Sequence, residues 1–142
     1  MKPENPAGVL GTRVPPPLPA TDKRLTFRLE PANGAVVLHC RGRIIFGPEA
    51  RALTELVADV LPAVRRMVVD LDGIEIVDSA GLGELVLLHM WAEAAGYSLK
   101  FASPREPVRR LLELTNLIAV FDAYDSVADA VSAMRNEMVF SA

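Results

Sequence analysis

The chain has 142 residues, of which 51% are hydrophobic and 23% charged, and its formal net charge is −3. These values predict one globular domain with a modest core, and the absence of a basic block argues against nucleic-acid binding. The single cysteine, Cys40, excludes an internal disulfide and a cysteine-clustered metal site, and its apolar neighbours indicate a buried thiol.

The first residues of the chain differ in composition from the rest. Six of the eleven prolines lie within residues 1–20. Proline favours extended chain, so we expect a disordered arm over 1–22, a folded domain over 23–138 and a short tail over 139–142. The arm lacks the apolar stretch of a secretory signal, and no run approaches the roughly 18 apolar residues of a membrane span. The sequence therefore predicts a cytoplasmic protein without membrane insertion.

Two strands joined by a tight turn are expected first. Leu25, Phe27 and Leu29 alternate with polar neighbours, a pattern typical of a half-buried strand. Asn33-Gly34 is the residue pair that suits a type I′ hairpin turn. The apolar run that follows the turn and ends at Cys40 predicts the second strand.

An amphipathic helix, a buried strand and a second helix are expected next. The first helix begins at Gly47-Pro48 and is predicted to end at Pro62. Residues 67–71 form a mostly apolar run around one aspartate, which predicts a central strand covered on both faces. Residues 80–95 are predicted to form the second helix, with Gly96 as its C-cap.

Shorter elements are expected toward the C-terminus. A strand is predicted over 97–103, a helix over 105–116 and a short strand over 118–121. Ser126 and Asp129 stand at capping-box spacing and predict the start of a last helix. The alternation of strands and helices implies an α/β fold with a mixed sheet.

The stretch "DSAGLG" joins the buried strand to the second helix. Aspartate and serine both cap helix N-termini, so either Asp78 or Ser79 is a candidate cap. Gly81 and Gly83 each cost up to about 1 kcal/mol relative to alanine in a helix, which suggests that another group approaches closely. The positive helix end also favours an anion. Ser79 is therefore either a plain cap or an exposed serine suited to carry a phosphate.

No catalytic constellation accompanies Ser79. "DSAGLG" matches neither a glycine-rich nucleotide loop nor the GxSxG nucleophile elbow. The only histidines are His39, within a predicted strand, and His89, well down the second helix, and they supply no nucleophile–base–orienter set. The sequence predicts a protein that is not an enzyme and uses no metal or cofactor. A small hydrolase remains a distant alternative.

The stretch "VVDLDGIEIVDSAGLGELVLLH" closely resembles the signature of STAS domains, in particular the stand-alone anti-sigma factor antagonists of bacteria. The resemblance extends from about Leu25 to Arg135. It implies a single STAS-type α/β domain, in which a small mixed sheet has helices packed mainly on one face.

The resemblance also implies a partner-switching function. The unphosphorylated protein would bind an anti-sigma factor, often a serine kinase, and so release a sigma factor. Phosphorylation of Ser79 would block binding, and a serine phosphatase acting on phospho-Ser79 would restore it. The residues expected at the partner surface are Asp78, Ser79, Ala80, Gly81, Leu82, Gly83, Val86, Ile45 and Phe46. The alternative is a STAS subunit of a lipid-transport or signalling-scaffold complex, in which Ser79 only caps the helix.

The helix predicted over 80–95 is apolar almost all round. One face must pack on the sheet. The remaining apolar residues either form a partner surface that begins at the two glycines or are buried as well.

Overall fold

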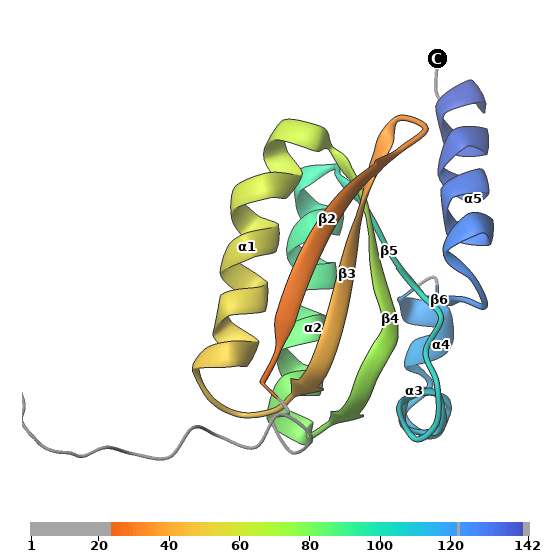
Figure 1. Ribbon diagram of the computed structural model, residues 1–142. Coiled ribbons are helices and arrows are strands. Elements are labelled where there is room, and N and C mark those ends of the chain that lie inside the picture. The colour runs from red at the N-terminus through yellow and green to blue at the C-terminus, as the bar shows by residue number, and fades with distance from the viewer. Residues whose placement is uncertain (1–23, 122, 141–142) are drawn as a thin grey trace, which may run out of the picture.

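The computed structural model describes residues 24–121 and 123–140 (Figure 1). The elements in chain order are β2 (Thr26–Ala32), β3 (Ala35–Ile44), α1 (Pro48–Val64), β4 (Arg66–Val77), α2 (Ser79–Ala95), β5 (Ser98–Ala102), α3 (Val108–Leu114), α4 (Leu117–Val120), β6 (Ala123–Tyr124) and α5 (Val127–Phe140). The arm expected over 1–22 lies outside the described residues. Helix α5 extends to Phe140 and so into the range 139–142 that is predicted as a tail.

The strands form one five-stranded mixed sheet with the order β2-β3-β4-β5-β6. The hairpin strands β2 and β3 are antiparallel, and the other neighbouring pairs are parallel. In the central strand β4, the side chains of Met67, Val68, Val69 and Leu71 are fully buried. The expected α/β fold with a mixed sheet and a doubly covered central strand is confirmed.

Helices cover the two faces of the sheet unequally. The larger core cluster contains buried residues of α1, α2 and α3, packed on side chains such as Met67 and Phe101. Helix α5 lies on the opposite face (Figure 1), where its residues Ala130 and Met134 belong to one buried cluster with Val68. Most of the helices therefore lie on one face, as the resemblance implied, and α5 alone covers part of the other.

The hairpin has the expected turn but a different burial pattern. Asn33 and Gly34 both have positive φ, 49° and 85°, as a type I′ turn requires. Leu25 is buried and Phe27 half-buried, whereas Leu29 is 43% exposed. The expectation that Leu29 faces the core was wrong. Strand β2 is at the edge of the sheet, and the hydrophobic core does not extend to Leu29.

Some predicted bounds and one predicted element were wrong. Helix α1 does not end at Pro62 but continues to Val64, and Arg65 closes it in a left-handed conformation with its N–H on Leu61 O. Pro62 is tolerated because it lies in the last turn on the exposed side of the helix. Residues 118–121 are not a strand: most of them belong to helix α4, since a short apolar run fits either structure, and the strand β6 follows it.

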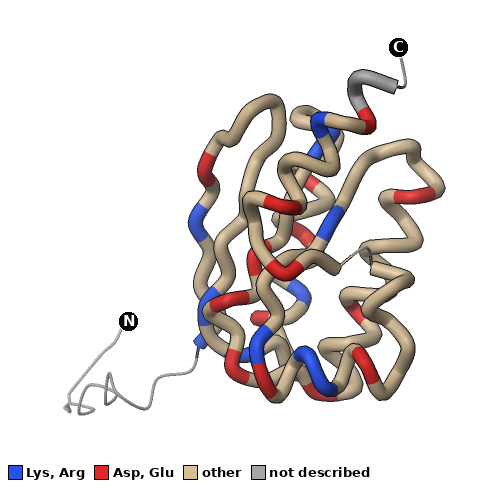
Figure 2. The backbone as a smooth tube through the Cα atoms, turned by 90° about the vertical axis from the view of Figure 1, so that its right-hand side faces the viewer, with Lys and Arg blue, Asp and Glu red and all other residues tan. Residues whose placement is uncertain are grey.

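Several local predictions are confirmed. Gly96 is the C-cap of α2 with φ 82°, and the Ser126 hydroxyl accepts the Asp129 N–H at 3.0 Å. Cys40 is buried, and this burial raises the pKa of its thiol to about 12, so the thiol is protonated and unreactive at neutral pH. In the view of Figure 2, the positions of Lys and Arg are interspersed with those of Asp and Glu along the described chain.

Candidate functional site

Asp78, not Ser79, caps helix α2. Its carboxylate accepts the N–H of Gly81 at 2.7 Å through Oδ1 and the N–H of Phe46 at 3.0 Å through Oδ2. These bonds, first that from Phe46 and then that from Gly81, lower the pKa of Asp78 below its ordinary value. One side chain thus fixes both the start of α2 and the loop that follows β3.

The backbone of β3 lies directly against the first turn of α2. Asp78 N–H donates to the Ile44 carbonyl oxygen at 3.3 Å. A Cβ on Gly81 would lie only 1.9 Å from the same oxygen, whereas a Cβ on Gly83 would have no neighbour within 4 Å. The close approach expected at both glycines therefore occurs at Gly81 alone, and Gly83 faces open space.

The hydroxyl of Ser79 is not engaged by any of the described residues. Ser79 is the first residue of α2 and is exposed, and its side chain makes no hydrogen bond to any of the described residues. Because Asp78 already satisfies the cap, the serine hydroxyl has no structural task in this part of the chain. It stands at the positive end of a 17-residue helix, where a phosphate is electrostatically favoured.

One face of α2 is apolar and uncovered. Leu85, Leu88 and Ala92 pack into the core, while Leu87 and Met90 are 62% and 59% exposed. Full burial of α2 is thereby excluded. The exposed residues recur at alternating spacings of three and four and form a line that we call the α2 stripe: Ala80, Gly83, Leu87, Met90 and Ala94.

The loop between β3 and α1 adds a large apolar side chain at the Ser79 end of the stripe. Phe46 is 81% exposed, and its backbone N–H is the one that Asp78 holds. Ile45 is half-buried. The two segments of the expected partner surface, 45–46 and 78–83, are therefore joined by a direct hydrogen bond.

The other expected partner residues divide by burial. Ser79, Ala80 and Gly83 are exposed, and Gly81 is buried under Ile44. Leu82 and Val86 are half-buried and pack against the core, so they offer only part of their side chains. The sequence left open whether the apolar residues of this helix that do not pack on the sheet are exposed or buried, and the structure shows that Leu87 and Met90 are exposed.

Among the described residues, neither histidine forms a hydrogen bond with Ser79. His39 hydrogen-bonds to Asp70 and Glu30, and His89 packs its ring on Phe121 with centroids 5.6 Å apart. Within the described ranges, no cluster of three or more metal-ligating side chains occurs. Among the same residues, no helix has the length and apolar character needed to cross a membrane.

The double role of Asp78 predicts a graded response to substitution. Asp78→Asn keeps an oxygen for the Gly81 N–H but offers an amide instead of an acceptor to Phe46, so we expect a small loss in melting temperature and a loosened 45–47 loop. Asp78→Ala removes both bonds and should lower the melting temperature further. Thermal melts monitored by circular dichroism measure both effects, with Asp59→Asn on the exposed side of α1 as the control.

The same residue predicts a pH dependence. Because the pKa of Asp78 is lowered in the folded state, its stabilising effect is present above the unfolded value of about 3.9 and is lost as the pH falls through the folded pKa. The melting-temperature difference between the wild type and Asp78→Asn should therefore shrink between neutral pH and about pH 3. A constant difference over this range would contradict the assignment.

A comparison with protein families matches residues 26–130 to the STAS domain. Over 67 residues, the chain is 33% identical to a proposed anti-sigma factor antagonist of Thermotoga maritima. This alignment covers 47% of the present chain and 59% of the relative, so the chain spans about three fifths of the curated relative that it matches.

Solved structures show the same architecture. An anti-sigma factor antagonist from Mycobacterium paratuberculosis is 26% identical, with a TM-score of 0.70 and coverage of 81% of this chain and 97% of that one. The unphosphorylated anti-sigma factor antagonist SpoIIAA has a TM-score of 0.64 at 17% identity, over 78% and 97% of the two chains, which is a likeness of fold. The same Bacillus protein has also been solved in a phosphorylated form.

Proposed function

The chain belongs to the STAS domain family, and we propose that it acts as an anti-sigma factor antagonist switched by phosphorylation of Ser79. The unphosphorylated protein binds an anti-sigma factor and thereby releases a sigma factor in the cytoplasm. A serine kinase, which is the anti-sigma factor itself in the simplest arrangement, modifies Ser79. A serine phosphatase restores the binding form, and the chain itself performs no catalysis.

This proposal rests on the Ser79 hydroxyl, which has no partner among the described residues and lies at the end of the exposed α2 stripe. Asp78 supplies the cap, so a phosphate on Ser79 would disturb no hydrogen bond among the described residues. The names of the Thermotoga and Mycobacterium relatives support the class of partner. The phosphorylated form of SpoIIAA supports the kind of modification for a protein of this fold.

The α2 stripe suggests how the partner binds. Residues at alternating spacings of three and four form one side of a helix–helix seam. We infer that the anti-sigma factor lays a helix along this line, with Leu87 and Met90 as its main apolar contacts. Ala80 and Gly83 carry little or no side chain, so the partner's backbone can approach α2 most closely beside Ser79.

The same geometry explains how phosphorylation would block binding. A phosphate adds nearly two negative charges at the closest point of approach. Binding would then require these charges to lose water against a surface shaped for a neutral hydroxyl, next to the existing charge of Asp78. The modification leaves the fold intact and weakens only the complex.

A charge placed in the stripe tests this binding mode. Leu87→Lys should leave stability close to that of the wild type, because the side chain is 62% exposed, but should weaken capture of the anti-sigma factor from the native cell by at least about tenfold. Ala58→Lys, at an exposed position of α1, is the matched control and should bind normally. Equal capture by both variants would show that the partner does not use α2.

A further inference from the structure

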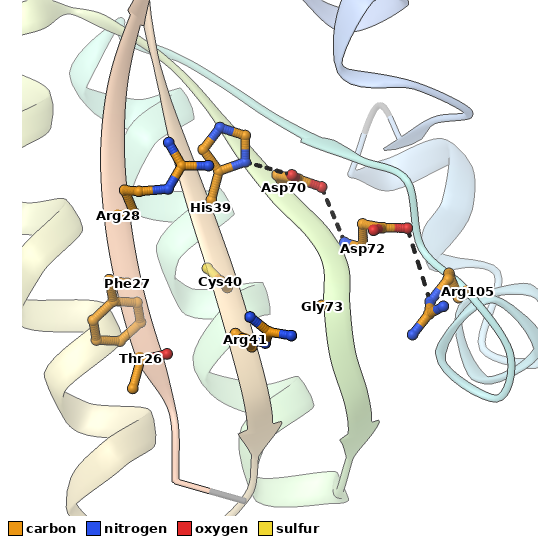
Figure 3. A pocket seen from close by; sticks show the side chains of 10 residues that line it. All are labelled: Thr26, Phe27, Arg28, His39, Cys40, Arg41, Asp70, Asp72, Gly73 and Arg105. Atoms are coloured by element: carbon orange, nitrogen blue, oxygen red, sulfur yellow. Dashed lines mark hydrogen bonds and ion pairs between the residues drawn. The ribbon is translucent and has the colours of Figure 1, made fainter.

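A polar groove lies on the sheet face opposite α1 and α2. Helix α5 covers only part of this face, and the strands β2, β3 and β4 leave a hollow of about 590 Å³ beside it (Figure 3). We call this hollow the sheet groove. It lies on a different face from the α2 stripe, and the function proposed above makes no use of it.

Two arginines face each other across the floor of the sheet groove. Arg41 extends from β3 toward Gly73 of β4, and Arg105, from the loop before α3, lies on the other side of β4 near Asp72 (Figure 3). A Cβ on Gly73 would lie 2.5 Å from the Cys40 carbonyl oxygen, so the close contact between β3 and β4 requires glycine here. The floor between the two guanidinium groups therefore has no side chain on it.

The guanidinium groups of Arg41 and Arg105 have fewer and longer polar contacts than the carboxylate of Asp70 in the same groove. The carboxylate of Asp70 is held by His39 at 2.6 Å and by the N–H of Asp72 at 3.0 Å. Within the described residues, the Arg105 guanidinium forms a single ion pair, a long one of 3.8 Å with Asp72. Arg41 has no ion pair with any residue in the described ranges. A second anion can therefore sit between Arg41 and Arg105 without breaking a short contact.

We propose that the sheet groove binds a small phosphate ester that carries hydroxyl groups. Two guanidinium forks on opposite sides suit the several oxygens of a phosphate better than the single planar edge of a carboxylate. The carboxylate of Asp72 is 65% exposed at the rim and accepts hydrogen bonds from neighbouring hydroxyl groups of the ligand. The groove is open to solvent, so binding is weak at high salt and selective mainly through these contacts.

The test uses ribose 5-phosphate as the probe and nuclear magnetic resonance of the full chain as the readout. At low salt, titration should shift the backbone amides of Gly73, Arg41 and their neighbours, while ribose alone should shift none. Arg41→Gln and Arg105→Gln should each weaken binding by about tenfold or more, because each removes a charge-assisted pair of hydrogen bonds. Both side chains are exposed, so neither variant should unfold.

Three comparisons make the result decisive. Arg51→Gln, on the exposed side of α1, should bind ribose 5-phosphate like the wild type. An equal loss of affinity in this variant would show that the effect comes from the overall charge of the protein. Inorganic phosphate should bind more weakly than the ester, and equal affinity would overturn the assignment to an ester. Ser79→Ala should keep full binding, so failure of the phosphorylation proposal leaves this one standing. Absence of any shift would refute the proposed site.

Discussion

Gly81→Ala should destabilise the domain by about 3 kcal/mol or more, whereas Gly83→Ala should leave it as stable or stabilise it by up to about 1 kcal/mol. The added Cβ at Gly81 would meet the Ile44 carbonyl oxygen at 1.9 Å, and this carbonyl is part of the backbone and accepts the Asp78 N–H. At Gly83 the Cβ has open space, and alanine is the better helix former. Urea unfolding of the two variants beside the wild type measures the difference.

Comparing the two glycine variants distinguishes the effect of packing on stability from the effect of helix propensity. Both positions lie in the first two turns of α2, so helix propensity alone predicts the same gain for each alanine. An unfolded Gly81→Ala together with a folded Gly83→Ala would agree with the structure. If Gly81→Ala has the same midpoint of urea unfolding as the wild type, then β3 does not lie against α2 as described.

The Gly83→Ala variant also tests a role of Gly83 in partner binding. Since no packing inside the described part of the chain requires glycine there, its place in the α2 stripe becomes the better reason for it. A Cβ at this position would keep a partner helix farther from α2. Gly83→Ala should therefore bind the anti-sigma factor less tightly than the wild type while melting no earlier.

Phosphorylation of Ser79 should weaken binding of the anti-sigma factor by about a hundredfold or more. With a serine-kinase anti-sigma factor and ATP, the wild type should gain one phosphate and leave the partner. Ser79→Ala should bind like the unmodified wild type and stay bound when ATP is present. Ser79→Asp should bind much more weakly than the wild type, although one carboxylate imitates a doubly charged phosphate poorly. Calorimetry and mass spectrometry give the affinities and the site.

Thermal stability provides the control for this experiment. A capping serine would lose about 1 kcal/mol on replacement by alanine. Because Asp78 is the cap, we expect Ser79→Ala to melt within a degree or two of the wild type, so that any difference in binding reflects the surface. If Ser79→Ala and Ser79→Asp bind equally and no phosphate is gained, a STAS subunit of another assembly becomes the better assignment.

The amino-acid sequence by itself determined most of the elements and their order. Period-two and helical spacings placed the strands and helices, and local chemistry placed the Asn33-Gly34 turn, the Gly96 cap and the Ser126 start of α5. These features depend on residues close in the chain, so the sequence pattern carries them. The strand predicted over 118–121 is wrong because four apolar residues fit the period of a strand and that of a helix equally well.

Only the tertiary structure decided what each candidate residue does. Asp78 and Ser79 are equally good caps in sequence, and the structure assigns the cap to Asp78, whose second oxygen also accepts the N–H of Phe46, 32 residues away. Gly81 and Gly83 look alike in sequence, but only one lies under a carbonyl of another strand. Arg41 and Arg105 line one groove because the fold places β3, β4 and the loop before α3 around it. Such contacts join distant segments, and no local period encodes them.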